Sequence, residues 1–237
     1  MRAILFDLDN TLYNSERALF SLIDVRINHY MQHVVGIAAD KVDGLRRRYW
    51  QQYGVTLQGL ILEHGADPED YLDYVHDIDV ASRLQANLPL RQMLHDLPQR
   101  KFVFTNGSHA HAMRVLQCLQ IEDCFEHIFD IRLSNYIPKP NRLPYEAVLG
   151  ATGLSGENCV MVEDSVDNLH MAAQLGMKTI LVQAQGPEAV MSDQPGAGVS
   201  PGAAGTSAAE APIDAIVERA EQVGDVIQDW MKSTCGQ

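Results

Sequence analysis

Short apolar runs rich in β-forming residues alternate with helical patterns along this chain, and this alternation limits its fold most. The runs occupy residues 3–7, 101–106, 159–164 and 178–182, with a weaker fifth run at 127–131. Continuous apolar runs of this length are typical of strands buried on both faces of a parallel sheet. Strands that alternate with helices predict an α/β fold, an open parallel sheet with right-handed crossovers and helices on its faces.

A long helical stretch separates the first two runs. Residues 15–97 show apolar residues at helical spacing and contain no strand run. A module inserted after the first strand would lie over the carboxyl edge of the sheet, where open α/β sheets bind their ligands. We therefore expect a core made of residues 1–14 and 98–237, and an all-helical cap domain made of residues 15–97.

Residues 185–212 differ from the rest of the chain in composition. They contain five Gly and four Pro but no aromatic residue, Lys or Arg, which favours a flexible loop. The following stretch, 213–231, is expected to form one closing helix that packs on the sheet. Its expected apolar face consists of Ile213, Ile216, Val217, Ala220, Val223 and Ile227.

The bulk properties restrict the possible partners. The chain has 237 residues and a net charge of −13, which argues against binding nucleic acid or an anionic membrane but not against a small anion in a local pocket. No apolar run approaches the roughly 20 residues of a membrane span, and the start lacks a signal-peptide layout. The four cysteines form no C-x-x-C pair, which favours reduced thiols over a metal knuckle. A cytoplasmic monomer or homodimer is expected.

Two carboxylates follow the first strand run. Asp7 and Asp9 stand two residues apart, and residues two apart in a strand point the same way. Two acids that share one site repel each other unless one is protonated or a cation lies between them. A turn or helix cap is the structural alternative, because Asp and Asn are common turn residues.

Polar residues also end the second strand run. Thr105, Asn106 and Gly107 combine a hydroxyl, an amide and a residue that permits close backbone approach. The helix expected after them would present free amides that attract anions. Of the two histidines in its first turn, His109 is expected to be nearer the pocket, and zinc binding by the pair is not expected because positions i and i+2 face apart on a helix.

Charged residues complete the expected edge of the sheet. Lys139 stands between two prolines, where the backbone is stiff, and Glu163 and Asp164 end the run that starts at 159. With Asp7 and Asp9, the four acids carry −4 and Lys139 returns +1. A pocket this negative needs a divalent cation before it can accept a phosphate, and oxygen ligands favour Mg²⁺.

In this order the motifs "DLDNT", "TNG", Lys139 before Pro140 and "EDSVDN" resemble the haloacid dehalogenase-like phosphatase superfamily. The resemblance implies a Rossmann-like core and a helical cap inserted after the first motif. It implies that Asp7 is the nucleophile, and that Asp9 protonates the leaving oxygen and then activates water. Phosphate would be held by Thr105 and Lys139, and by backbone amides of Leu8, Asp9 and Asn106.

The resemblance also implies a metal site and a narrower branch. Mg²⁺ would be held by Asp7, the Asp9 carbonyl and Asp164, with Glu163 supporting it from outside. Longer stretches, among them "FDLDNTLY" and "YGVTLQGLILEHG", are similar to pyrimidine 5′-nucleotidases. Arg142 replaces the second Pro of the pattern K-P-x-P-x-x-Y in that branch.

The implied substrate is therefore a small phosphate ester, a pyrimidine nucleoside 5′-monophosphate. In the cap, Tyr53 and Thr56 lie in the stretch expected to meet the nucleoside, although a Tyr in a core is a common alternative. A sugar-phosphate or phosphoglycolate-type phosphatase and a phosphomutase of the same superfamily are the alternatives. A phosphate-binding protein without activity is disfavoured because Asp7, Asp9 and Lys139 are all present.

Overall fold

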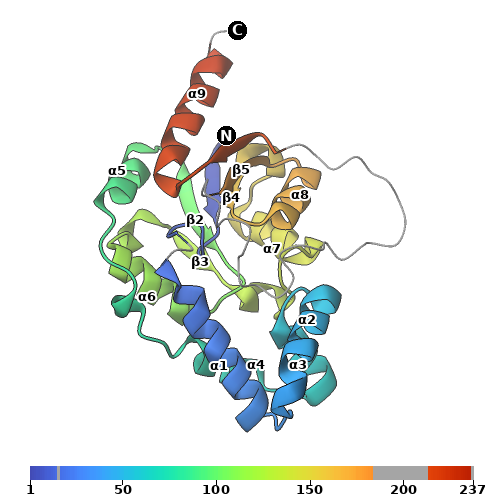
Figure 1. Ribbon diagram of the computed structural model, residues 1–237. Coiled ribbons are helices and arrows are strands. Elements are labelled where there is room, and N and C mark those ends of the chain that lie inside the picture. The colour runs from blue at the N-terminus through green and yellow to red at the C-terminus, as the bar shows by residue number, and fades with distance from the viewer. Residues whose placement is uncertain (15–16, 184–212, 236–237) are drawn as a thin grey trace.

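The computed structural model describes residues 1–14, 17–183 and 213–235 (Figure 1). Its centre is a six-stranded sheet in the order β3-β2-β1-β4-β5-β6, with every neighbouring pair parallel. The strands are β1 (Ala3–Phe6), β2 (Arg100–Phe104), β3 (His127–Phe129), β4 (Cys159–Glu163), β5 (Lys178–Val182) and β6 (Ala215–Val217). The α/β prediction is confirmed, and all five predicted strand runs contain a strand.

Helices cover both faces of the sheet because alternate strand residues point to opposite sides. On one face Ile4, Phe6 and Val160 pack against α5 (Leu88–Asp96), α6 (His109–Leu119) and α9 (Val223–Cys235). On the other face Leu5 and Met161 pack against α7 (Arg142–Thr152) and α8 (Val166–Gln174). The apolar runs seen in the sequence are thus buried from both sides.

Four helices form the insert between β1 and β2: α1 (Leu19–His33), α2 (Ala39–Tyr53), α3 (Thr56–His64) and α4 (Pro68–His76). They enclose a separate apolar cluster that includes Ile27, Tyr49 and Leu60. In Figure 1 they lie together at the end of the sheet away from α5 and α9. The fifth helix of this stretch, α5, packs instead against α9 and the short helix η6 (Ala220–Gln222) of the core.

The prediction of one closing helix over 213–231 is wrong. Residues Ala215–Val217 form β6, which pairs with β5 from Ile180 to Val182, and the helix begins only at Val223. Asp214 anchors the strand, since its carboxylate accepts hydrogen bonds from the amide and hydroxyl of Thr179 at 2.8 and 3.1 Å. Ile216, which was predicted to lie on the apolar face of that helix, is 61% exposed. A short apolar run fits either a helix or a strand, and here pairing with an open sheet edge decides.

Two further predictions concern the loop at 185–212 and membrane-spanning helices. The loop lies outside the described residues. Among the described helices, none combines the length and the apolar character needed to cross a membrane.

Candidate active site

Three adjacent strands bring polar residues to one edge of the sheet. Asp7 directly follows β1, Thr105 directly follows β2, and Glu163 is the last residue of β4. Because β1 pairs with both β2 and β4 in parallel, these three carboxyl ends meet side by side. The Asp7 amide donates to the Val162 carbonyl at 2.9 Å, which extends the pairing with β4 up to the acid.

Lys139 joins the ends of these three strands. Its ammonium donates to Asp7 Oδ1 at 2.7 Å, to Glu163 Oε2 at 2.7 Å and to the Phe104 carbonyl at 2.8 Å. Only 2% of Lys139 is exposed. All three of its hydrogens are therefore used, as an ammonium in a buried site requires.

Lys139 and the acids around it together carry more negative than positive charge. Burial, and then the charge of Glu163, raise the pKa of Asp7 in spite of the nearby Lys139. Burial, Glu163 and Asp7 raise the pKa of Asp164 well above its usual range. Burial disfavours the ammonium of Lys139, but the charges of Asp7 and Glu163 outweigh that and raise its pKa. Lys139 is thus the one cation close to three acids, Asp7, Glu163 and Asp164. A further positive charge would be stabilised among them.

A metal ion would fit this arrangement. Asp7, Glu163 and Asp164 each offer a carboxylate oxygen, and these oxygens lie within 4.8 Å of one another. A set made only of oxygen donors matches hard cations such as Mg²⁺. Both oxygens of Glu163 already accept hydrogen bonds, Oε2 from Lys139 and Oε1 from the amides of Asp164 and Ser165. Asp7 and Asp164 would therefore be the better direct ligands, with Glu163 orienting its neighbours through these hydrogen bonds.

Asp9 lies in a different environment from Asp7. Its Oδ1 accepts hydrogen bonds from Tyr13 Oη at 2.6 Å and from His111 Nε2 at 2.8 Å. Burial alone would raise the pKa of Asp9, but the charge and hydrogen bond of His111 and the Tyr13 hydroxyl lower it overall. Both hydrogen bonds that the structure describes use Oδ1, while Oδ2 lies toward Gly107, where an added Cβ would be 3.7 Å away. That distance is an ordinary van der Waals contact, so Oδ2 lies directly beside the loop that follows β2.

The insert contacts the core directly behind Asp9. His76, the last residue of α4, stacks on His111 with ring centroids 4.5 Å apart. Its carbonyl accepts a hydrogen bond from Arg114 Nη2 at 2.7 Å, and its Nδ1 lies 3.1 Å from Ser108 Oγ. Burial, and then the nearby His111, lower the pKa of His76 to about 3, so its ring is neutral. The end of α4 is therefore fixed to the first turns of α6.

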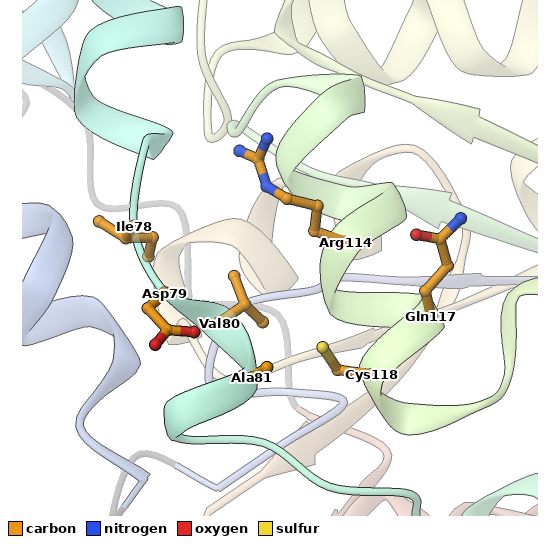
Figure 2. A pocket seen from close by; sticks show the side chains of 7 residues that line it. All are labelled: Ile78, Asp79, Val80, Ala81, Arg114, Gln117 and Cys118. Carbon is orange, nitrogen blue, oxygen red and sulfur yellow. The ribbon is translucent and has the colours of Figure 1, made fainter.

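A cavity of about 370 Å³ lies along the same seam (Figure 2). One wall is the segment that follows α4, with Ile78 and Val80, and the other is α6, with Arg114 and Cys118. None of the residues that line it belongs to the predicted site. This hollow therefore marks the boundary between insert and core and not the predicted catalytic edge.

Asn106 connects two loops of the site. Its Oδ1 accepts from the Lys139 amide at 2.8 Å, and its Nδ2 donates to the Lys139 carbonyl at 3.2 Å. The Asn106 side chain thus fixes the backbone that carries the buried ammonium. Thr105 lies beside it with only 2% exposed, and its Oγ1 accepts from the Gly107 amide at 2.9 Å. That bond leaves the Thr105 hydroxyl hydrogen available to an anion.

The remaining predicted residues make no described side-chain hydrogen bond to the acids of the site. Leu8 has a fully buried side chain in the core, so only its backbone is available to a ligand. Tyr53 ends α2 and Thr56 begins α3, and Tyr53 Oη donates to Glu63 at 3.2 Å. Gly54, between them, lies against the lysine loop, where an added Cβ would be 3.2 Å from Pro138 Cγ. This cap turn therefore touches the loop that carries Lys139.

The neighbours of Asp9 differ from those expected. His109, expected near the pocket, is exposed, and its amide donates to Asp130 Oδ2 at 2.8 Å. His111 reaches the site instead and is fully buried. Its position was detectable, because His111 stands four and eight residues before the buried Val115 and Leu119 on one helix face.

The sequence of this chain matches a known protein family. A family model described as haloacid dehalogenase-like hydrolase matches residues 1–176. Phosphate metabolism protein 8 of Saccharomyces cerevisiae is 29% identical over 197 residues, which cover 76% of this chain. The chain spans 61% of the length of that yeast protein.

Solved structures with the same fold cover nearly the whole chain. L-2-haloacid dehalogenase from Xanthobacter autotrophicus superposes with a TM-score of 0.60 at 14% identity, covering 96% of this chain and 98% of its own. A phosphatase of the haloacid dehalogenase (HAD) type from Thermococcus onnurineus gives 0.58 at 16% identity, with the same coverage. At these identities the similarity shows the fold, a Rossmann-like core with a helical insert. The family match over most of the sequence shows more: the chain belongs to the haloacid dehalogenase-like hydrolases.

Proposed function

We propose that this hydrolase is a Mg²⁺-dependent phosphomonoesterase that forms an aspartyl phosphate on Asp7. The observation that carries the proposal is the pair of 2.7 Å hydrogen bonds from Lys139 to Asp7 and Glu163. They hold one Asp7 oxygen in place and supply positive charge where a phosphoryl group would lie. A carboxylate held this way can attack phosphorus.

The reaction needs two proton transfers, and Asp9 is placed for both. In the first step Asp7 forms a bond to phosphorus, the bond to the ester oxygen breaks, and that oxygen takes a proton from Asp9. In the second step Asp9 takes a proton from water, which attacks the aspartyl phosphate and frees Asp7 and inorganic phosphate. The resting Asp9 is ionised, since its pKa is lowered. Negative charge on a bound phosphate opposes that shift and favours the protonated acid needed first.

Phosphate and metal would share the remaining groups. Thr105 would donate its hydroxyl to a phosphoryl oxygen, and backbone amides of Leu8, Asp9 and Asn106 would contribute further donors. Asp7, Asp164 and the Asp9 carbonyl would hold Mg²⁺, which when bound neutralises charge on the phosphate. The related structure of a Bacillus subtilis HAD hydrolase, which is bound to magnesium, supports this choice of metal.

For the substrate we propose a pyrimidine nucleoside 5′-monophosphate. The helical insert, α1–α4, would act as a cap that closes over the leaving group and excludes water. Its turn at Gly54 lies against the lysine loop, so Tyr53 and Thr56 would be the cap residues near the nucleoside. Sequence similarity to a yeast protein of phosphate metabolism favours a phosphate ester over a haloacid.

The test is release of inorganic phosphate from a panel of nucleotides, sugar phosphates and phosphoglycolate, with and without EDTA. We expect UMP and CMP to be among the best substrates and EDTA to abolish turnover. If both nucleotides are among the poorest, the sugar-phosphate alternative replaces the nucleotidase. Isomerised product without released phosphate would identify a phosphomutase, and halide release from 2-haloacids a dehalogenase.

A further inference from the structure

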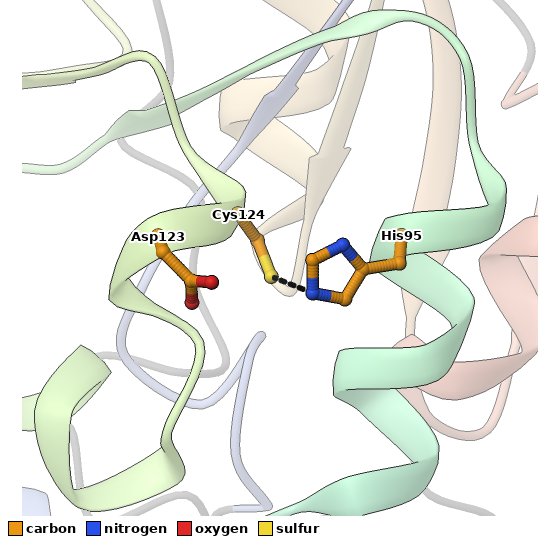
Figure 3. A group of neighbouring side chains, drawn as sticks. All are labelled: His95, Asp123 and Cys124. Carbon is orange, nitrogen blue, oxygen red and sulfur yellow. Dashed lines mark hydrogen bonds between the residues drawn. The ribbon is translucent and has the colours of Figure 1, made fainter.

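A second cluster of potential ligands lies at the other edge of the sheet. His95, Asp123 and Cys124 meet there (Figure 3). His95 is the penultimate residue of α5, which leads into the start of β2. Asp123 and Cys124 belong to the short helix η3 (Glu122–Cys124), which leads into the start of β3. The cluster therefore lies near the amino ends of the strands, whereas Asp7 lies at the carboxyl ends.

The three side chains have the spacing of ligands around one small ion. Their ligand atoms lie within 4.8 Å of one another, and Cys124 Sγ is 3.8 Å from His95 Nε2. For tetrahedral zinc, bonds of about 2.3 Å to sulfur and about 2.0 Å to nitrogen place these two atoms roughly 3.6 Å apart. The observed separation differs from that value by a shift that a side-chain rotation can supply.

The chemical kinds of the donors select the metal. Thiolate, imidazole and carboxylate are the three protein ligands of zinc, whereas Mg²⁺ requires oxygen donors. We infer that His95, Asp123 and Cys124 form a zinc site whose fourth position is open to water. A thiolate and a carboxylate carry −2, and Arg91, which is hydrogen-bonded to Asp123, adds +1 beside the site.

The surroundings support ligation by Asp123. Arg91 holds this carboxylate with two hydrogen bonds, from Nη1 to Oδ1 at 2.5 Å and from Nη2 to Oδ2 at 2.7 Å. A carboxylate has about four lone-pair positions, so two remain free for a metal. Hydrogen-bonded outer partners commonly orient the carboxylates that bind metals. Arg91 thus fixes the carboxylate beside the thiol and does not block it.

The exposure of the three side chains determines how a zinc ion would reach the site. His95 and Asp123 are exposed while Cys124 is 8% exposed, so an ion can enter from solvent and reach a protected sulfur. Zinc bound here would connect α5 to η3, two segments that meet only in the folded chain. Because zinc would bind the native state preferentially, it should raise the melting temperature. This inference is independent of the proposed phosphatase activity.

The experiment uses the full chain, stripped with a chelator and kept in excess Mg²⁺. Equilibrium dialysis against Zn²⁺ counts bound zinc, and replacement by Co²⁺ reports thiolate ligation through charge-transfer absorption in the near ultraviolet. The variants are Cys124→Ser, His95→Gln and Asp123→Asn, and the matched control is Cys118→Ser. An Asp164→Asn background removes a predicted ligand of the carboxylate cluster, so that any zinc bound there is distinguished.

We expect one zinc that depends on Cys124, with the cobalt band present in the wild type, in Cys118→Ser and in the Asp164→Asn background. Each ligand variant should weaken zinc affinity at least ~100-fold, since outer partners alone commonly contribute 10- to 100-fold. His95→Gln is at the surface and should fold normally, so its result does not depend on the stability of Cys124→Ser. Zinc affinity unchanged in His95→Gln, or no zinc bound by the wild type, would overturn the inference.

Discussion

The helical insert and the carboxyl edge of the sheet both contain ion pairs, but they differ in how many acids share one buried cation and in how exposed some of the pairs are. At the sheet edge the side chains of Lys139 and Glu163 are 1% and 2% exposed. In the insert, Arg48 pairs with Glu63 while 50% and 29% of their side chains remain exposed. Exposed pairs contribute little to stability, whereas burying charges costs desolvation that folding alone does not recover. Buried charge alone does not separate the two regions, because Arg46 and Asp24 of the insert are also only 8% and 16% exposed. The sheet edge differs in that one buried cation pairs with two buried acids.

The largest effect should come from Asp7. Asp7→Asn removes the proposed nucleophile while keeping its shape, so phosphate release should fall by at least ~10⁴-fold. Initial rates on UMP with saturating Mg²⁺ measure this. Circular dichroism of the variant should match the wild type. Substantial residual turnover by a folded variant would assign the nucleophile to another group.

The comparison itself can be tested with Lys139→Met and Arg46→Met. Removing Lys139 leaves Asp7 and Glu163 buried without their cation, which should lower the free energy of unfolding by about 3–5 kcal/mol. Added Mg²⁺ should recover part of that loss. Arg46, in the insert, pairs with Asp24 and Asn28, and its removal should cost a smaller amount, about 1–3 kcal/mol. Urea unfolding measures both. Equal losses would remove the distinction between the two regions.

A smaller effect concerns the seam between insert and core. The folded-state pKa of His76 is lowered to about 3 from 6.5, so the unfolded chain binds the proton more tightly. Its stabilising contribution is complete above pH 6.5 and is lost as the pH falls toward 3. Between pH 7 and pH 5 the wild type should lose about 2 kcal/mol more than His76→Gln does. Urea unfolding at the two pH values measures this, with exposed His127→Gln as the control. Parallel losses in wild type and His76→Gln would contradict it.

The smallest effect is expected at the cap turn. The Tyr53 hydroxyl donates to Glu63 and not to the lysine loop, so Tyr53→Phe should leave KM for UMP unchanged within error. Tyr53→Ala removes the whole ring next to Gly54, which lies against that loop, and should raise KM with little change in kcat. A KM that rises equally in both variants would place the hydroxyl, and not the ring, on the substrate.

The core of the fold could be predicted because its strands are continuous apolar runs that end in polar residues. Where periodicity is ambiguous the prediction was wrong: Ala215–Val217 fits a helical pattern, yet pairs with β5. The grouping of Asp7, Glu163 and Lys139 at one edge agrees with the expected convergence of the strand ends. Their roles stay predictions.

Other features of the site depend on side-chain directions that spacing does not reveal. The hydrogen bond from His111 to Asp9 joins residues 102 positions apart. The side chain of Asn106, whose backbone amide was expected to bind phosphate, bonds to the backbone of Lys139. For the same reason, the sequence does not predict the cluster of His95, Asp123 and Cys124. Its members come from two segments, without the C-x-x-C spacing that indicates a metal site.

The central position of β1 also has a consequence for synthesis on the ribosome. Asp7 emerges early, but its partner strand β4 ends only at Glu163. Until that segment has left the ribosomal tunnel, Asp7 lacks the carboxylates of Glu163 and Asp164, although Lys139 emerges before them. A nascent chain therefore cannot complete this carboxylate cluster before most of it has been translated, and fragments that stop ahead of β4 should lack it.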